Sequence, residues 1–281
     1  MKFGVGIPTC TAGMMYPPPF ASAEEVVRVA LEAEQLGYYE VAGNDHLSTQ
    51  RYVREAFSHP PDFFEPLITL SYIAAQTSVL RLMTGVIVLP SRQPVVLAKQ
   101  VATLDQLSGG RLILGVGLGA YREEFEAAMP DLSSAPRASL LREGIDALRV
   151  LFTERRASYV GRYHRFRDVE MYPKPQQNPL PIYSSANSDG AIRRAALQCE
   201  GWLPAGINPA RLREGRQKLR TIAAAAGRDP DQIVIAPQLT VCLGRTTEEA
   251  RDRFEHSQLY HHLLSLARST MRDIPASTHI E

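Results

Sequence analysis

The chain lacks the features that mark several specialised classes of protein. Its 281 residues include only 3 cysteines, and these are far apart at Cys10, Cys199 and Cys242. Such spacing forms neither a disulfide framework nor a cysteine metal site, so we expect no metal and a reducing compartment. The 31 basic and 30 acidic side chains leave a net charge of +1, which gives no reason to propose nucleic acid or an anionic membrane as a partner.

Long hydrophobic runs are also missing. No stretch reaches the roughly 20 apolar residues that a membrane-spanning helix needs. The N-terminus carries one lysine and an apolar run too short for a signal peptide. Neither a G-x-S-x-G, a Walker nor an H-E-x-x-H motif occurs. These absences predict a soluble cytoplasmic protein without the common hydrolase, nucleotide-binding or zinc-protease signatures.

Short apolar, β-rich runs alternate with amphipathic helical patterns along the chain. This alternation predicts parallel βα units around a buried sheet. The predicted strands are residues 3–7, 38–42, 80–89, 111–116, 180–184, 202–205 and 233–243. The predicted helices are residues 22–36, 66–77, 95–107, 121–129, 140–153, 189–198, 209–226 and 247–269.

Seven such units predict an α/β fold of the (β/α)₈ TIM-barrel type, formed by residues 1–281 as a single domain. Residues 155–172 interrupt the rhythm after the fourth strand and predict an inserted hairpin. Only seven strands can be counted, so the eighth βα unit is missing and we expect the C-terminal end to be truncated. An open barrel would expose a sheet edge.

The carboxyl ends of the strands should carry the active site of such a barrel. Asp45 and His46 follow the second strand. A histidine there can exchange a proton near neutral pH, and a neighbouring carboxylate can tune its charge. The alternative is that Asp45 caps a turn and His46 packs against it.

Residues 115–120 (GVGLGA) fit the dinucleotide fingerprint G-x-G-x-x-A. A dinucleotide-binding Rossmann fold would need a further strand between residues 121 and 153, where only helix and loop are predicted. We expect instead that glycines such as Gly117 let a planar ligand or a neighbouring backbone approach the barrel mouth. Tight packing of strand against helix is the alternative.

Residues Ser185, Ala186, Asn187 and Ser188 lead directly into a predicted helix that carries Arg193 and Arg194. Unpaired backbone N–H groups, hydroxyls and the positive end of the helix dipole make this turn a candidate anion site. The alternative is a plain N-cap.

The sequence resembles the bacterial-luciferase-like superfamily of flavin- or F420-dependent oxidoreductases. The resemblance runs from about residue 3 to residue 270. It is carried by residues 84–90 (TGVIVLP), 98–111 (AKQVATLDQLSGGR), 114–117 (LGVG), 123–125 (EEF), 181–183 (PIY) and 201–204 (GWLP).

The resemblance implies a barrel with an insertion after the fourth strand and a reduced FMN or F420 across its mouth, with F420 slightly preferred because of Asp45 and His46. It also implies a cis peptide at Gly85-Val86, next to Thr84, that backs the cofactor ring. It further implies a phosphate-binding turn at residues 185–188. A small-molecule substrate and a homodimer follow from the same resemblance.

Two departures from the family pattern oppose a simple transfer of function. Relatives usually carry Gly-Gly where this chain has Ser185-Ala186, and they continue with an eighth βα unit. The leading hypothesis is an oxidoreductase that transfers hydride, or oxygen activated at the ring, to a small organic substrate, with His46 and Asp45 as catalytic residues. The alternative is a catalytically silent cofactor-binding barrel or fragment. The substrate pocket would be formed by residues 9–20, 51–64 and 155–172.

Overall fold

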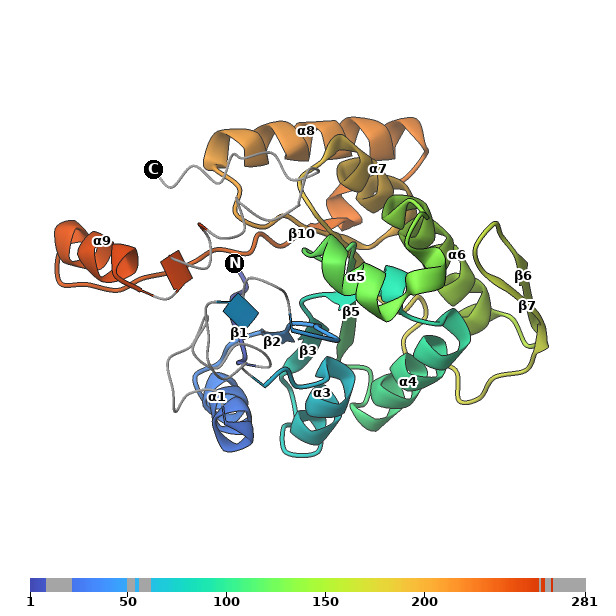
Figure 1. Ribbon diagram of the computed structural model, residues 1–281, viewed down its shortest axis with the longest axis horizontal. Coiled ribbons are helices and arrows are strands. Elements are labelled where there is room, and N and C mark those ends of the chain that lie inside the picture. The colour runs from blue at the N-terminus through green and yellow to red at the C-terminus, as the bar shows by residue number, and fades with distance from the viewer. Residues whose placement is uncertain (9–21, 50–53, 56–61, 258, 261–263, 265–281) are drawn as a thin grey trace.

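A curled parallel sheet forms the centre of the molecule (Figure 1). The computed structural model describes residues 1–8, 22–49, 54–55, 62–257, 259–260 and 264. The strands follow the order β1-β2-β3-β5-β8-β9-β10, β4 pairs with β5, and every pair in this sheet is parallel. Their bounds are β1 Gly4–Gly6, β2 Glu40–Gly43, β3 Arg81–Thr84, β4 Ile87–Val88, β5 Leu112–Gly117, β8 Ile182–Ser185, β9 Gly201–Leu203 and β10 Val234–Ile235.

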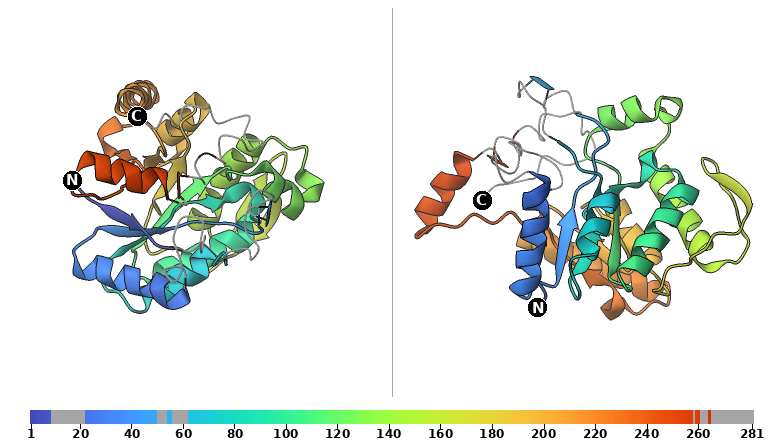
Figure 2. Two further views of the ribbon diagram at one scale, coloured as in Figure 1. Left: turned by 60° about the vertical axis from the view of Figure 1, so that its left-hand side comes forward. Right: turned by 90° about the horizontal axis from the view of Figure 1, so that it is seen from below.

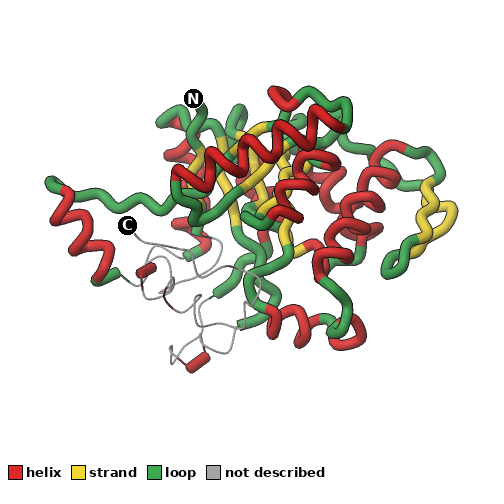
Figure 3. The backbone as a smooth tube through the Cα atoms, turned by 90° about the horizontal axis from the view of Figure 1, so that it is seen from above, coloured by secondary structure: helices red, strands yellow, loops and turns green. Residues whose placement is uncertain are grey.

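Helices cover the outer face of this sheet, as the views in Figures 2 and 3 show. The main core lies between the strands and helices α1, α3, α4 and α6, and a second apolar cluster around Trp202 joins α7 and α8 to β9 and β10. The bounds are α1 Ala23–Gln35, α3 Pro66–Ala74, α4 Pro94–Leu107, α5 Arg122–Ala128, α6 Arg137–Thr153, α7 Asp189–Gln198, α8 Pro209–Ala225 and α9 Thr247–Glu255. The described residues also form three 3₁₀ turns, η1 Leu89–Ser91, η2 Pro130–Leu132 and η3 Pro230–Gln232.

The predicted insertion is a hairpin that projects from the body next to α6 (Figure 1). Its strands, β6 Ala157–Val160 and β7 Arg165–Val169, pair antiparallel. The carboxylate of Glu143 on α6 accepts hydrogen bonds from the backbone N–H groups of Arg162 (3.1 Å) and Tyr163 (2.9 Å) at the hairpin tip. The insertion is therefore fixed to the barrel by a buried carboxylate and confirms the sequence prediction.

The third predicted strand is wrong as a continuous element. Residues 80–89 form two strands, β3 and β4, separated by a cis peptide bond between Gly85 and Val86. β3 pairs with the first half of β5 and β4 with its end, so the same neighbour continues on both sides of the interruption. Apolar periodicity continues through the break, and the sequence pattern therefore did not reveal it.

The last predicted strand is also wrong in length. Only Val234–Ile235 of residues 233–243 form β10, followed by one parallel bridge between Ala205 and Gln238. Leu239, Val241 and Leu243 are exposed. Their alternating apolar pattern matches a strand, but within the described residues they have no neighbouring strand to pair with.

The sheet is a half-barrel rather than a closed ring. In the described part of the chain β1 pairs with β2 and β10 with β9, and β1 and β10 do not pair with each other. The helix predicted over residues 247–269 begins as α9, which ends at Glu255. α9 lies apart from the sheet (Figure 1). The α/β TIM-barrel-like class is thus confirmed in an incomplete form.

Candidate functional site

The carboxyl ends of β2, β3, β5 and β8 meet at one edge of the sheet because these strands are parallel neighbours. Most of the predicted site residues lie at or just beyond these ends. Asp45 and His46 follow β2, Thr84 ends β3, Gly117 ends β5 and Ser185 ends β8. The fold therefore gathers segments that are far apart in the sequence.

His46 is held by a carboxylate from α5. Its Nδ1 lies 3.0 Å from Oε2 of Glu124, and the two side chains are only 15% and 9% exposed. The other carboxylate oxygen, Oε1, accepts the backbone N–H groups of Leu47 (2.5 Å) and Ser48 (3.3 Å). Because a carboxylate accepts hydrogen bonds, Nδ1 carries the proton in this pair, and Nε2 is the nitrogen directed away from Glu124.

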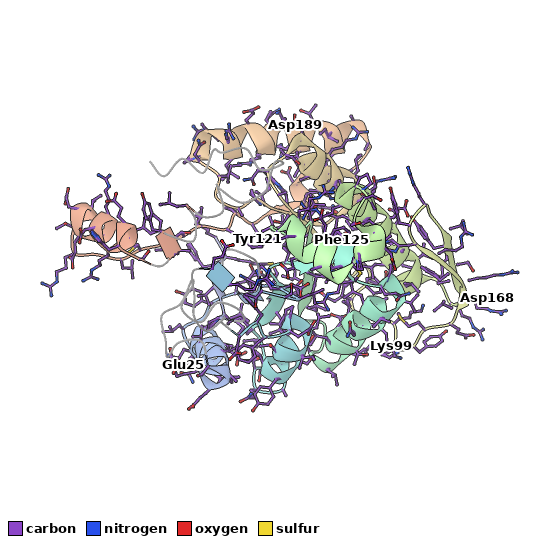
Figure 4. All side chains as sticks on the ribbon, viewed as in Figure 1. Glu25, Lys99, Tyr121, Phe125, Asp168 and Asp189 are labelled. Carbon is purple, nitrogen blue, oxygen red and sulfur yellow. The ribbon has the colours of Figure 1, made fainter. Side chains whose placement is uncertain are left out.

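Aromatic rings line the same histidine. The ring centroid of Phe63 lies 5.2 Å from that of His46, and that of Tyr121 lies 6.0 Å away. Tyr121 is the N-cap residue of α5, and Figure 4 shows it beside Phe125 on that helix. The imidazole thus lies in a partly apolar environment that limits its contact with water.

Asp45 is buried and directed away from the histidine pair. Its Oδ2 accepts the backbone N–H of Val88 at 2.9 Å, and its Oδ1 accepts a hydrogen bond from Arg92. Arg92 also donates to Glu65 at 3.1 Å, and Glu65 caps the N-terminus of α3. The pair predicted from the sequence is therefore divided into two separate networks.

The glycines of β5 make room for the β3–β4 segment. A Cβ atom added to Gly115 would lie 2.0 Å from the carbonyl oxygen of Thr84. One added to Gly117 would lie 2.6 Å from Cγ2 of Val86. The close approach of a neighbouring backbone, one of the interpretations of this glycine motif, accounts for Gly115. At Gly117 the space is filled by the Val86 side chain of the same segment.

The β3–β4 segment also contains a cis peptide bond and a buried hydroxyl group. The peptide bond between Gly85 and Val86 is cis, as the family resemblance implied. Thr84 is fully buried, and its hydroxyl donates to the carbonyl oxygen of Gly115 at 2.7 Å.

A Rossmann fold is excluded, because residues 121–153 contain only α5, η2 and α6 between their loops.

The turn before α7 is ordered by hydrogen bonds within the protein. Ser188 is the N-cap, and its side chain accepts from the N–H of Ala191. The side chain of Asn187 donates to the carbonyl of Ala205 at 2.6 Å and accepts from the N–H of the same residue at 3.2 Å. Any anion at this turn would consequently be bound by backbone N–H groups and hydroxyls rather than by the Asn187 amide.

Ala186 adopts a backbone conformation that favours glycine. Its φ is +118°, and its carbonyl oxygen accepts a hydrogen bond from the indole N–H of the buried Trp202 at 2.8 Å. This conformation disfavours any side chain, so the turn carries strain at the position where relatives were expected to have glycine.

The two arginines of α7 differ in their surroundings. Arg193 is exposed, whereas Arg194 is buried and its Nε donates to the hydroxyl of Ser184 at 3.0 Å. Burial lowers the pKa of Arg194.

Sequence reasoning did not single out Glu124 or Arg92 as site residues. Glu124 was quoted only as part of the EEF motif at residues 123–125, and the signal that could have found it is a buried acid at the start of a helix that follows β5. The proposed substrate loops, residues 9–20 and most of 51–64, lie outside the described residues. The described residues hold no group of three metal-ligating side chains and no helix long and apolar enough to cross a bilayer.

Comparison with known protein families covers nearly the whole chain. The model of the family described as luciferase-like monooxygenase matches residues 1–276. The chain belongs to the luciferase-like monooxygenase family. The non-prolyl cis peptide bond between Gly85 and Val86 and the hairpin bound by Glu143 are therefore features of a luciferase-like chain.

Several curated relatives cover part of this luciferase-like chain. An uncharacterized protein from Mycobacterium tuberculosis is 33% identical over 192 residues, which are 66% of this chain and 63% of the relative. An F420-dependent glucose-6-phosphate dehydrogenase from Kineococcus radiotolerans is 32% identical over 189 residues, covering 65% of this chain and 54% of the enzyme. The matches thus span less than two thirds of each relative's length.

Solved structures share the fold. A monooxygenase from Streptomyces bottropensis has a TM-score of 0.75 and 28% identity, over 95% of this chain and 79% of that one. A coenzyme F420-dependent tetrahydromethanopterin reductase from Methanopyrus kandleri has a TM-score of 0.73 and 20% identity, over 96% of this chain and 76% of the other. The second likeness concerns the fold alone.

Proposed function

We propose that this luciferase-like chain is an oxidoreductase that binds reduced F420 or FMN across the carboxyl ends of β2, β3, β5 and β8. When bound, the cofactor supplies the redox chemistry, transferring hydride, or oxygen activated at the ring, to a small organic substrate. The observation that carries the proposal is the pair formed by His46 and Glu124, which lies at the same sheet edge as the Gly85-Val86 segment and the N-terminus of α7.

The residues at this edge fit such a cofactor. The N-terminus of α7, capped by Ser188, offers backbone N–H groups and a positive dipole end to a phosphate. Ser185, Ala186 and Asn187 form the turn that would approach it. Thr84, Gly85 and Val86, at the break between β3 and β4, and Gly117, at the end of β5, are the residues proposed to contact the ring.

The imidazolium form of His46, which carries a proton on each ring nitrogen, is the proposed proton donor. Glu124 keeps the proton of Nδ1 and fixes the ring orientation, so Nε2 is the nitrogen that would exchange a proton with the substrate or cofactor. Phe63 and Tyr121 lie beside the His46 ring and reduce the access of water to the imidazole. Proton transfer by a positioned side chain contributes typically about 10²–10⁴-fold to a rate.

F420 is preferred over FMN. Asp45-His46 is the sequence feature that favours it, and curated relatives from Kineococcus radiotolerans and Segniliparus rotundus, each 32% identical, are F420-dependent glucose-6-phosphate dehydrogenases. The substrate class is proposed only as a small organic molecule that a hydride or activated oxygen can modify.

A turnover assay on His46→Ala tests the proposal. Oxidation of reduced F420 or FMN is followed with small carbonyl compounds as hydride acceptors and with oxygen, and cofactor affinity is measured by fluorescence on the same samples. We expect turnover to fall by about 10²-fold or more while cofactor affinity changes by less than about threefold. Equal losses of turnover and affinity would remove the catalytic role of His46.

A catalytically silent cofactor-binding barrel is the second candidate. The strained Ala186, with its φ of +118°, favours it because a less adaptable turn would hold the phosphate poorly. Saturable cofactor binding with no turnover on any substrate, in the unsubstituted chain, would support this form over the enzyme.

A further inference from the structure

The loop that carries His46 is tied to the β3–β4 segment at two points. The N–H of Gly85 donates to the carbonyl oxygen of Gly43 at 2.6 Å. The N–H of Val88 donates to Oδ2 of Asp45 at 2.9 Å. These two bonds lie on either side of the Gly85-Val86 peptide, so this segment and the residue preceding His46 are parts of one hydrogen-bonded unit.

Arg92 completes this unit. It donates to Oδ1 of Asp45 and, through Nη1, to Oε1 of Glu65 at 3.1 Å. The Asp45 side chain is only 1% exposed and that of Arg92 13%. A buried carboxylate is costly without a cation, so the ion pair with Arg92 stabilises the Asp45 side chain in one orientation. We call Asp45, Arg92 and the Val88 N–H the Asp45 clamp.

We propose that Asp45 and Arg92 are positioning residues that fix the distance between His46 and the Gly85-Val86 segment. The proposal rests on the proposed function, because that segment would contact the cofactor ring and His46 would exchange the proton. Both oxygens of Asp45 accept hydrogen bonds within the clamp, and Glu124 rather than Asp45 contacts the imidazole. Asp45 therefore acts through the geometry of the loop and transfers no proton itself.

The two contacts of Arg92 also explain why we expect lysine to be a poor replacement for arginine at position 92. A planar guanidinium can bond two carboxylates at once in a fixed orientation, whereas an ammonium group is a point charge on a flexible stem. Arg92 joins Asp45 on the β2 loop to Glu65 at the start of α3. Lysine at this position would keep the charge but would not hold the two carboxylates in the same arrangement.

A purely structural role makes a different prediction. Loss of a buried ion pair would then lower the free energy of unfolding but leave the spacing between His46 and a bound cofactor unchanged. The spacing can be measured directly, because the ring current of a tricyclic cofactor shifts the NMR signals of a nearby imidazole and this shift falls steeply with distance.

The experiment compares Arg92→Met, Arg92→Lys, Asp45→Asn and the double variant Asp45→Asn/Arg92→Met. The double variant removes both charges of the Asp45–Arg92 pair, so neither is left without the other, and it keeps the test possible if a single variant fails to fold. Arg28→Met is the matched control, because Arg28 forms exposed ion pairs with Glu25 and Glu32 within α1 and none with a residue of the clamp. His46 signals are assigned by His46→Asn, and each protein is titrated with F420 and with FMN.

We expect Arg28→Met to reproduce the cofactor-induced shift of His46, and the clamp variants to lose it while still binding cofactor within about tenfold of the unsubstituted affinity. Arg92→Lys should recover only part of the shift. The Val88 amide should exchange with solvent at least about tenfold faster in the double variant.

A normal His46 shift in the clamp variants would overturn the proposal, as would an unchanged Val88 exchange rate. Loss of cofactor binding together with the shift would also contradict it, because the clamp would then serve binding itself. Absence of any shift in the unsubstituted protein would instead remove the proposed function, and this inference with it.

Discussion

The imidazole of His46 and the carboxylate of Glu124 lie 3.0 Å apart although 78 positions separate them in the chain. The loop after β2 carries the histidine, and α5, after β5, carries the glutamate. The same carboxylate accepts the N–H groups of Leu47 and Ser48. One buried side chain therefore sets both the orientation of the imidazole and the path of the loop around it.

Replacing Glu124 by Gln should destabilise the protein. The glutamine oxygen can still accept the N–H groups of Leu47 and Ser48. The glutamine nitrogen would then face the Nδ1–H of His46, which places two donors against each other. Loss of charged acceptor groups in a buried site costs about 1–3 kcal/mol. Chemical denaturation measures the difference in unfolding free energy.

Glu126→Gln on the same helix is the control for this change. Glu126 forms an exposed i,i+4 ion pair with Arg122, and such pairs contribute at most about 0.5 kcal/mol. Equal destabilisation by the two substitutions would show that the Glu124 contact contributes no more than a surface ion pair.

Gly117→Ala should disturb the β3–β4 segment, because the added Cβ would lie 2.6 Å from Cγ2 of Val86. Overpacking of this kind costs about 1–3 kcal/mol. Val86→Ala removes the opposing methyl groups, so Gly117→Ala/Val86→Ala should be more stable than the sum of the single changes predicts. Additive losses in this double-mutant cycle would contradict the assigned contact.

The fold was predictable from the sequence where a local signal agreed with the tertiary structure. The bounds of α7, Asp189–Gln198, follow from the Ser188 cap and the apolar spacing, and the structure reproduces them. The break between β3 and β4 was not visible in periodicity, because apolar residues continue on both sides of it. The strand predicted over 233–243 failed for the opposite reason, since its alternating pattern lacks a neighbouring strand in the described residues.

The candidate site was only partly predictable. Asp45 and His46 are adjacent in sequence, and this adjacency suggested one catalytic pair. Their side chains leave the loop in different directions, toward Arg92 and Glu124. Both partners come from other elements, and a single sequence carries no signal that links positions 45 and 92 or 46 and 124.

Ala186→Gly should stabilise the turn before α7. At a φ of +118° glycine avoids the strain that a Cβ imposes, and the expected gain is about 1 kcal/mol after its greater flexibility in the unfolded chain is counted. The substitution should also tighten cofactor binding. Thermal unfolding and a fluorescence titration measure the two effects.

Ala195→Gly provides the comparison, because Ala195 lies within α7. There glycine should destabilise by about 1 kcal/mol or more. If Ala186→Gly were destabilising by a similar amount, the turn would not be strained at this residue.

The hairpin contact should weaken in acid because of His164. Burial lowers the pKa of this imidazole, whose Nε2 has no hydrogen-bond partner among the described residues. The unfolded chain then binds the proton more readily, so stability is fully present above the ordinary histidine pKa of about 6.5 and is lost as the pH falls below it.

His164→Gln should therefore flatten the pH dependence of unfolding between about pH 7 and 5. Glu143 acts in the same direction at lower pH. Burial alone would raise the pKa of its carboxyl, but the N–H groups of Tyr163, Arg162 and His164 lower it overall. If the unfolding midpoint depends on pH identically in the unsubstituted protein and in His164→Gln, His164 is excluded as the titrating group.

Equilibrium binding of F420 and FMN is the decisive experiment for the proposed cofactor site. The unsubstituted protein is titrated with each cofactor, oxidised and reduced, while protein and cofactor fluorescence are followed. We expect saturable binding of at least one of them at one molecule per chain, weakened by Gly117→Ala and strengthened by Ala186→Gly. No saturable binding of either cofactor up to about 1 mM would contradict it.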